Sequence, residues 1–307
     1  MSRAHVVSPA ELSSLRDLEI VARTTVEGLR QGLHRSPFHG YSAEFSQYRH
    51  YRPGDDLKYV DWKAFGRTDR LYSRQFRETT NLRALFVIDL SGSMAFPEGP
   101  SSARVNRLPA SKLALAKAAA AVLATLVIDQ GDAAGILAVA GDARERVHYM
   151  PARSGRHHLH VLLGALARLQ AGGAEGVSRG LQRTAAVLRR RGMVVILSDF
   201  YEEDVALAEV RRLSRMGHDV IVIQVIAREE LSLPAGRSIE FEDLETGATV
   251  VTNADAIRHE YQQRIDAFVA RIQQAVRREG LDYLRLVTGE PLEPVLRRFL
   301  VGRRGGE

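Results

Sequence analysis

Residues 85–94 read LFVIDLSGSM, in which an apolar run ends in an aspartate and two serines follow at alternate positions. A short, continuous apolar run is typical of a strand that is buried on both faces of a parallel sheet. Further runs of this kind follow at residues 135–139, 193–197 and 220–226. Asp89 is therefore expected where a buried strand ends and the chain leaves the sheet.

The segments between these apolar runs have the length and composition of helices. They cover residues 111–130, 155–169, 177–191 and 203–216. Glycines at 131, 192 and 217 follow three of them, as expected of C-terminal caps. Alternating strands and helices predict an α/β fold with a doubly wound, mostly parallel sheet and helices on both of its faces. Residues 111–130 are apolar almost all round, which predicts a helix buried against the sheet.

The 307 residues suffice for one large α/β domain with an appendage. We predict four parts: an N-terminal helix and loop (1–36), a mixed, strand-rich segment (37–80), the α/β domain with a C-terminal extension (81–300) and a flexible tail (301–307). The first helix is expected to start near Pro9 and to end near Thr24. Past residue 226 the pattern predicts a hairpin near 245–247, a helix over 255–279, a strand over 283–287 and a helix over 292–300.

Composition excludes several classes of protein. The chain has no cysteine, so disulfides, thiolate zinc sites and cysteine nucleophiles are excluded. The sequence shows no signal peptide, and its longest apolar run is too short to cross a bilayer, so we expect a cytoplasmic protein without membrane insertion. The formal net charge is +6, but the arginines are spread over several helices, so nucleic-acid binding is the less favoured interpretation.

The residues at the ends of two predicted strands point to a metal site. Ligands of doubly wound sheets bind beyond the carboxyl ends of the strands, where Asp89, Ser91 and Ser93 can converge from one loop. Asp199 follows another strand and is expected at the same edge, where it can hold a metal-bound water. Carboxylate and hydroxyl oxygens suit Mg²⁺ or Mn²⁺. A purely structural loop, in which the serines cap the turn and the aspartates accept backbone hydrogen bonds, is the alternative.

Two groups of motifs carry a resemblance to known proteins. Asp89-Leu90-Ser91-Gly92-Ser93 resembles the Asp-x-Ser-x-Ser motif of the metal-ion-dependent adhesion site in von Willebrand factor A-like domains, and Asp199 is similar to that site's later aspartate. Residues 51–56 (YRPGDD), 61–64 (DWKA) and 67–68 (RT) resemble the segment that distinguishes the bacterial domain-of-unknown-function 58 family. Together the motifs cover about residues 40–226 and identify the chain as a member of that family with a von Willebrand factor A-like domain.

The resemblance implies a function in recognition. In adhesion sites of this type, a carboxylate from the partner completes the coordination of the ion. The chain would then be a non-catalytic protein–protein interaction module, and a MoxR-type AAA+ ATPase is the partner that the resemblance implies. One departure is that the family's metal site usually adds a threonine after a glycine pair, whereas Ala174 follows Gly172 and Gly173 here. Glu175, Ser178 or water would have to take its place.

Other functional hypotheses have less support in the sequence. A metal-dependent hydrolase that uses the same aspartate and serines is the main alternative, although the usual catalytic motifs of hydrolases are absent from the sequence. His157 and His160 lie one helical turn apart, but no third metal ligand is evident. Aromatic and basic residues alternate between Tyr48 and Lys63, where internal ion pairs are the simpler interpretation. Trp62, the only tryptophan, is expected in the core.

Overall fold

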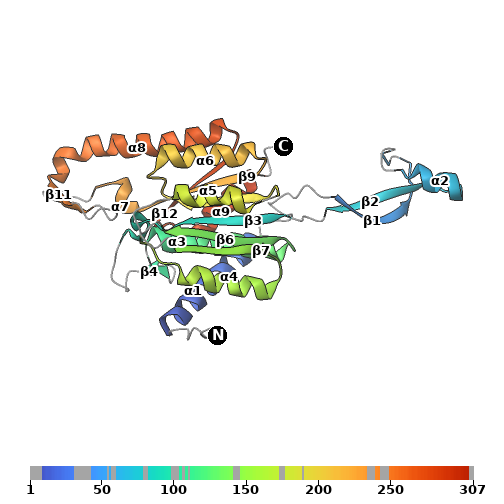
Figure 1. Cartoon of the computed structure of the whole chain (residues 1–307), viewed down its shortest axis with the longest axis horizontal. Coiled ribbons are helices and arrows are strands. Elements are labelled where there is room, and N and C mark those ends of the chain that lie inside the picture. Colours follow the sequence, from blue (N-terminus) through green and yellow to red (C-terminus); the bar gives the residue numbers. More distant parts are fainter. Residues whose placement is uncertain are drawn as a thin grey trace. The chain divides into compact units, whose positions relative to one another are not determined.

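The computed structural model describes residues 9–30, 43–53, 55–56, 60–78, 82–97, 104–105, 108–109, 111–140, 146–172, 177–188, 190–233, 239–242 and 249–303. The chain divides into two compact units. Residues 1–37 and 83–307 form the larger unit, and residues 38–82 form the smaller one. The N-terminal helix therefore belongs to the same unit as the sheet (Figure 1).

A six-stranded sheet forms the centre of the larger unit, with the strand order β12-β9-β8-β3-β6-β7. The strands are β3 (Arg83–Asp89), β6 (Ala133–Ala140), β7 (Arg146–Arg153), β8 (Met193–Ser198), β9 (Asp219–Ile226) and β12 (Asp282–Val287). All neighbours pair in parallel except β6 and β7, which are antiparallel. The predicted doubly wound α/β fold is confirmed. The sequence did not predict β7, because this edge strand leaves side chains such as Tyr149 exposed and has no continuous apolar run.

Helices cover both faces of this sheet, as predicted. On one side lie α5 (Val177–Val187), α6 (Glu203–Arg215) and α8 (Ala254–Arg278) (Figure 1). On the other side lie α1 (Pro9–Arg30), α3 (Lys112–Asp129), α4 (Arg156–Arg168) and α9 (Leu292–Gly302). Among the described helices, none combines the length and the apolar character that a membrane span requires.

Helix α3 lies between the sheet and helix α1, which explains its composition. Fourteen of its eighteen residues are buried, and the prediction that this helix is buried is confirmed. Helix α1 packs on it through Leu18, Ala22, Val26 and Leu29, which are all buried and recur every three or four residues. Because this stripe continues past Thr24, α1 is longer than the sequence predicted.

The smaller elements of the larger unit connect the strands to their helices. They are η2 (Gly92–Ala95), β4 (Arg104–Val105), β5 (Leu108–Pro109), α7 (Arg228–Leu231), β10 (Ile239–Glu242) and β11 (Thr249–Thr252). Strands β10 and β11 pair antiparallel, which confirms the predicted hairpin, although its turn at residues 243–248 lies outside the described residues.

The C-terminal end of the described chain is anchored. Helix α9 runs to Gly302, and the guanidinium of Arg303 donates to Asp219 Oδ2 at 2.6 Å and to Asp282 Oδ2 at 2.5 Å. These two carboxylates come from neighbouring strands of the sheet. The prediction of a flexible tail that begins at residue 301 is therefore wrong for residues 301–303, and residues 304–307 lie outside the described part of the chain.

The smaller unit is an antiparallel pair of strands, β1 (Ala43–His50) and β2 (Tyr72–Glu78), with helix α2 (Trp62–Thr68) between them in the sequence. This confirms the predicted strand-rich segment. Asp61 caps α2 by accepting from the backbone N–H groups of Lys63 and Ala64, and it also accepts from the hydroxyl of Tyr48. Arg49 and Asp55 form an ion pair at 2.8 Å, in line with the expected internal pairing of charges.

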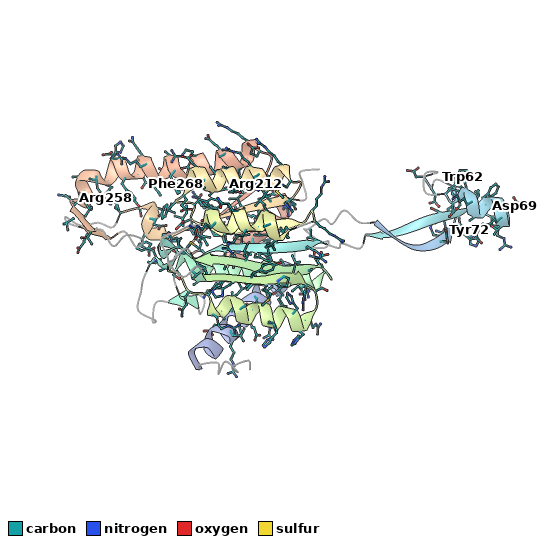
Figure 2. The ribbon with its side chains drawn as sticks, in the orientation of Figure 1. Trp62, Asp69, Tyr72, Arg212, Arg258 and Phe268 are labelled. Atoms are coloured by element: carbon teal, nitrogen blue, oxygen red, sulfur yellow. The ribbon has the colours of Figure 1, made fainter. Side chains whose placement is uncertain are left out.

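The position of Trp62 differs from the prediction. It is 58% exposed at the first position of α2, a helix without a buried residue (Figure 2). Two strands and a seven-residue helix offer too little surface to enclose an indole ring, so the expectation of a core tryptophan is wrong. The ring packs at 6.4 Å, edge to face, against Phe65, which is itself exposed.

Candidate functional site

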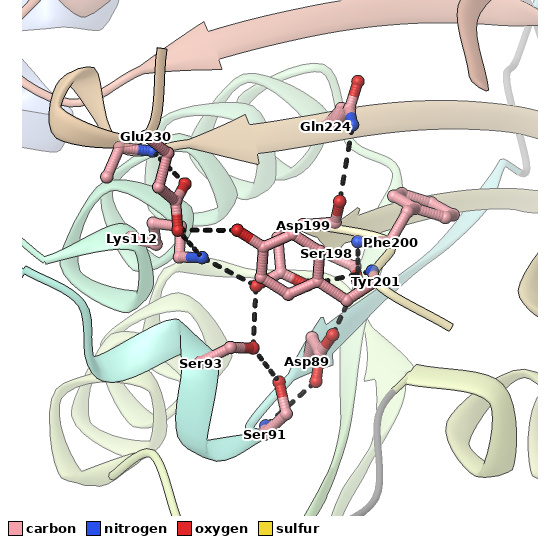
Figure 3. A network of polar contacts seen from close by, with 11 residues as sticks. Asp89, Ser91, Ser93, Lys112, Ser198, Asp199, Phe200, Tyr201, Gln224 and Glu230 are labelled. Carbon is pink, nitrogen blue, oxygen red and sulfur yellow. Dashed lines mark hydrogen bonds and ion pairs between the residues drawn. The ribbon is translucent and has the colours of Figure 1, made fainter. Parts of the chain in front are cut away.

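The four predicted site residues, Asp89, Ser91, Ser93 and Asp199, lie together at the carboxyl ends of two central strands (Figure 3). Asp89 ends β3 and Asp199 follows β8, and these two strands are parallel neighbours in the sheet. The hydroxyl of Ser93 donates to Asp199 Oδ2 at 2.7 Å, and the Ser91 and Ser93 hydroxyl oxygens are 3.0 Å apart. The order of the strands in the sheet therefore brings together Asp89 and Asp199, which are 110 positions apart in the sequence.

Asp89 is buried and is held by two donors. Its Oδ1 accepts from the backbone N–H of Ser91 at 2.9 Å, and its Oδ2 accepts from the Ser198 hydroxyl at 2.5 Å. Burial and the negative charge of Asp199 raise the pKa of Asp89 from 3.8 to about 7. A nearby cation would have the opposite effect on this carboxyl group, because it would favour the ionised form.

The loop after β3 is fixed by backbone hydrogen bonds. The short helix η2 begins there, and the N–H of Met94 donates to the carbonyl of Ser91 at 3.1 Å. The N–H of Gly172 donates to the carbonyl of Leu90 at 2.9 Å and joins the loop to the chain that follows α4. Ser91 is 1% exposed and Ser93 is 9% exposed. The serine hydroxyls are thus positioned by the fold, and Ser93 lies nearer to solvent.

Lys112 is part of this site, although the sequence did not single it out. Its side chain is fully buried at the start of α3, and its ammonium group pairs with Asp199 Oδ2 at 2.8 Å and with Glu230 Oε1 at 2.6 Å. Burial by itself would lower the pKa of Lys112, but the charges of Asp199 and Glu230 raise it above its ordinary value. The ammonium group is therefore a permanent positive charge beside the serine loop.

Glu230 and Tyr201 cover this lysine. Glu230 Oε2 accepts from the N–H of Ala227 at 2.8 Å, and its Oε1 accepts from the Tyr201 hydroxyl at 2.8 Å. The ring of Tyr201 lies over the ammonium group, 4.7 Å from Nζ to the ring centre. Burial and the charge of Glu230 raise the pKa of Tyr201, so this hydroxyl remains a donor.

The turn after β8 points Asp199 and Tyr201 toward the loop. Between them, Phe200 has a φ of +64°, which is an uncommon conformation for a residue with a side chain. Its N–H donates to the Ser198 hydroxyl at 2.9 Å, and this hydroxyl in turn donates to Asp89. Ser198 thus connects the unusual turn to the first aspartate, and it too was absent from the sequence prediction.

One sequence signal could have identified Lys112. A lysine in the first turn of a helix opposes the helix dipole, which favours negative charge at that end. Lys112 stands there directly after the N-cap Ser111 in a helix that is otherwise almost wholly buried. A buried lysine in that position requires carboxylate partners, although the sequence does not show that they come from Asp199 and Glu230.

The Ser91 and Ser93 hydroxyl oxygens lie at hydrogen-bond distance, and this spacing is also that of neighbouring ligands of a small divalent ion. For metal–oxygen bonds of about 2.1 Å in an octahedron, two neighbouring ligand oxygens lie about 3.0 Å apart. The Ser91 and Ser93 hydroxyl oxygens are separated by 3.0 Å. Among the described residues, no three His, Asp or Glu side chains form a cluster that could hold a metal ion. Any ion here would therefore depend on the serine hydroxyls.

Ala174, which stands where the family has a threonine, lies outside the described residues, as does Glu175. Ser178 is described: it is buried in the first turn of α5, and its hydroxyl has no hydrogen-bond partner in the part of the chain that the structure describes. Ser178 and Tyr201 line the same open cavity of about 720 Å³.

Among the described residues, His157 and His160 of α4 belong to no cluster of three possible metal ligands. His160 Nδ1 lies 2.7 Å from Glu19 Oε1, and the intervening His158 contacts the carbonyl of Ala134. Neither contact involves the other imidazole groups of this helix.

Sequence comparison relates the chain to proteins of mycobacteria. An uncharacterised protein of Mycobacterium tuberculosis is 30% identical over 311 residues, covering 100% of this chain and 94% of its own length. An uncharacterised protein of Mycobacterium bovis matches to the same extent. A third, from Mycobacterium avium, is 30% identical over 166 residues, which cover 51% of this chain and 95% of that protein.

Solved structures with some similarity include the conserved hypothetical protein BatB from Bacteroides thetaiotaomicron, with a TM-score of 0.43 and 16% identity, covering 73% of this chain and 100% of that one. Another is a von Willebrand factor type A protein from Catenulispora acidiphila, with a TM-score of 0.35 and 15% identity, covering 78% of this chain and 46% of that one. The family model "Protein of unknown function DUF58" matches residues 47–270. The chain therefore belongs to the DUF58 family.

Proposed function

We propose that this protein is a non-catalytic protein-interaction module whose loop from Asp89 to Ser93 binds Mg²⁺ or Mn²⁺. The observation that carries the proposal is the pair of serine hydroxyls, 3.0 Å apart, beside the carboxylates at the ends of two neighbouring strands. Hard oxygen donors at this spacing suit a small divalent ion. When bound, the ion would supply a Lewis-acidic position that a carboxylate of a partner protein completes.

Each residue of the loop has a distinct part in this proposal. Ser91 and Ser93 would hold the ion directly through their hydroxyl oxygens. The Asp89 carboxylate accepts from the Ser91 N–H and the Ser198 hydroxyl, and its remaining lone pairs could accept from a metal-bound water. Asp199 accepts from Ser93 and Lys112, so its part is to orient the Ser93 hydroxyl and to support a further water.

The charge balance of the site also supports a divalent ion. Asp89, Asp199 and Glu230 carry three formal negative charges when all are ionised, and Lys112 compensates one of them. One divalent cation would neutralise the remaining two. In the protein alone, burial and the charge of Asp199 raise the pKa of the Asp89 carboxyl group to about 7.

We place the partner protein at the open cavity lined by Ser178 and Tyr201. This cavity has a volume of about 720 Å³ and reaches the site at Tyr201, whose ring covers Lys112. Ser178 would contribute its free hydroxyl in place of the missing threonine. For the partner we retain the hypothesis of a MoxR-type AAA+ ATPase, which rests on the family resemblance.

A hydrolase is the weaker candidate because the serines lack an activating base. The neighbours of the Ser93 hydroxyl are Ser91 and Asp199, and the charge of Asp199 is already compensated by Lys112 at 2.8 Å. A carboxylate that is paired in this way is a poor acceptor for the proton of a nucleophile. The arrangement therefore favours binding over catalysis.

Calorimetric titration of Mg²⁺ and Mn²⁺ tests the metal site. Wild-type protein should bind one ion saturably, whereas Asp89→Ala and Ser93→Ala should lose binding. Thr184→Val is the matched control, because Thr184 is another buried hydroxyl of this unit and donates only to the carbonyl of Gly180. Binding that survives in both loop variants, or that is absent from the wild type, would overturn the metal proposal.

The interaction itself is tested by capture from a lysate of the native host. The wild type should retain an AAA+ ATPase in Mg²⁺ and lose it in EDTA, and Ser93→Ala should retain none under either condition. Release of phosphate from generic phosphoesters in Mn²⁺ by the wild type, lost in Ser93→Ala, would instead establish the hydrolase.

A further inference from the structure

The edge strand β12 has one side without a partner strand. Strand β12 stands at the end of the strand order, and its other side pairs with β9. This pairing runs from Asp282 opposite Ile221 to Val287 opposite Ile226. Alternate residues of a strand direct their backbone N–H and C=O groups to opposite sides. Among the described elements, none adds a strand to the outer side of β12. Within the described part of the chain, its outward backbone groups therefore have no strand partner.

This free edge lies in a groove between two helices. The groove has a volume of about 590 Å³, and α8 and α9 contribute its walls, while residues 281–285 contribute its floor. Helix α8 covers one face of the sheet and α9 covers the other, so the groove follows the rim between them. An occupant that pairs with the strand must itself be extended, because the backbone groups of a helix are already bonded to one another.

Three arginines line this groove without a carboxylate partner among the described residues. Arg277 comes from α8, Arg285 from β12 and Arg298 from α9, and all three are exposed. The fourth, Arg303, is already paired with Asp219 and Asp282. Glu290 is the only other carboxylate of the lining, so unpaired positive charges outnumber it by three to one. The groove thus attracts negative charge.

Apolar groups lie beside the arginines. Leu281, Val295 and Phe299 line the groove and are only partly buried. Tyr283 lies next to them, and its hydroxyl donates to Gln224 Oε1 at 2.7 Å, which holds the ring in place. An occupant with alternating acidic and apolar side chains would match this surface, since alternate residues of a strand point to opposite faces.

We propose that the edge of β12 is a docking site for an extended acidic segment of a partner protein, which adds a seventh strand to the sheet. Main-chain hydrogen bonds to β12 would give affinity, and Arg277, Arg285 and Arg298 would select for Asp and Glu. Strand β12 has six residues, so the docked segment would span about 20 Å at about 3.3 Å per residue. This proposal does not depend on a metal ion at Ser91 and Ser93.

Charge distinguishes this occupant from a second copy of the same chain. Pairing of two β12 edges would bring two sets of unpaired arginines together, and such a contact is unfavourable. Single-stranded nucleic acid would satisfy the arginines, but it cannot pair with the backbone of an edge strand. An acidic peptide uses both features of the groove.

Selection from a displayed library of random twelve-residue peptides tests the proposal. Wild-type protein should enrich sequences in which Asp or Glu alternates with apolar residues. The triple variant Arg277→Ser, Arg285→Ser and Arg298→Ser should bind these peptides at least tenfold more weakly. The control triple variant Arg23→Ser, Arg153→Ser and Arg156→Ser removes three exposed arginines elsewhere and should bind them like the wild type.

A second measurement separates strand addition from simple charge attraction. The best peptide is made in two versions, each N-methylated at one of the two sets of alternate residues. One version should lose binding, because its donors face β12, and the other should keep it. No enrichment, enrichment that survives the groove variant, or equal tolerance of both N-methylated versions would overturn the proposal. Tight binding of a labelled dT20 oligonucleotide that needs the same arginines would also overturn it, in favour of nucleic acid.

Discussion

Replacement of Lys112 by methionine should destabilise the larger unit strongly. Methionine fills a similar volume but removes the ammonium group that contacts Asp199 at 2.8 Å and Glu230 at 2.6 Å. The side chains of these carboxylates are 2% and 12% exposed, so water cannot replace the lost partner. Removal of one member of a buried ion pair costs about 3–5 kcal/mol. In a unit of this size, that cost corresponds to a fall in Tm of about 6–20 °C.

Lys117→Met on the same helix is the matched control. Lys117 is partly buried, its ammonium group donates to the carbonyl of Ala167 at 3.2 Å, and burial lowers its pKa to about 8. Loss of one hydrogen bond to a neutral group costs about 1 kcal/mol. Thermal and urea unfolding followed by circular dichroism should therefore separate the two variants by at least about 2 kcal/mol.

A double variant keeps the test informative if Lys112→Met does not fold. Glu230→Gln removes one of the two carboxylates left unpaired, so Lys112→Met with Glu230→Gln should recover part of the lost stability. Equal destabilisation by Lys112→Met and Lys117→Met would refute the conclusion that the charge of Lys112 holds the site together. A double variant that is no more stable than Lys112→Met would refute it as well.

Three further predictions concern the metal-free protein. Because the pKa of Asp89 is raised in the folded protein, Asp89 keeps its proton there at pH values at which the unfolded chain has released it. The free energy of unfolding should therefore fall as the pH rises from about 4 to about 7. Urea unfolding at several pH values should show this fall, and the fall should be smaller in Asp89→Asn. Trp62→Ala should change stability by no more than about 0.5 kcal/mol, because the ring is 58% exposed; a blue-shifted emission of this only tryptophan would contradict that exposure. Arg303→Gln should cost about 1–3 kcal/mol in urea unfolding, because two charged hydrogen bonds are lost. Arg298→Gln should cost almost nothing, and equal effects of the two substitutions would show that the ion pairs of Arg303 do not anchor the end of the chain.

The sequence predicted the parts of the fold that depend on local pattern. Buried parallel strands such as β8 are continuous apolar runs, and α3 is apolar all round, so both could be read directly. Strand β7 was missed because it has no continuous apolar run and most of its described side chains are exposed. Trp62 was misplaced because composition gives no information on how much surface surrounds a ring.

The candidate site was predictable where it depends on strand ends. Asp89 and Asp199 terminate recognisable strands, and the rule that ligands bind at the carboxyl ends of strands places them at one edge. Lys112 and Glu230 were not predictable in this way. Lys112 begins α3 and Glu230 lies in the short helix α7, and only the tertiary fold brings these two helices together. The sequence therefore indicated the oxygen donors and missed the cation beside them.

The most direct test of a divalent ion in the loop from Asp89 to Ser93 is the anomalous scattering of crystals grown with Mn²⁺. We expect a single manganese peak within coordination distance of the Ser91 and Ser93 hydroxyl oxygens, with the Lys112 ammonium group still paired to Asp199. A site without anomalous density, in which the serine hydroxyls bond only to each other and to Asp199, would contradict a metal-dependent function.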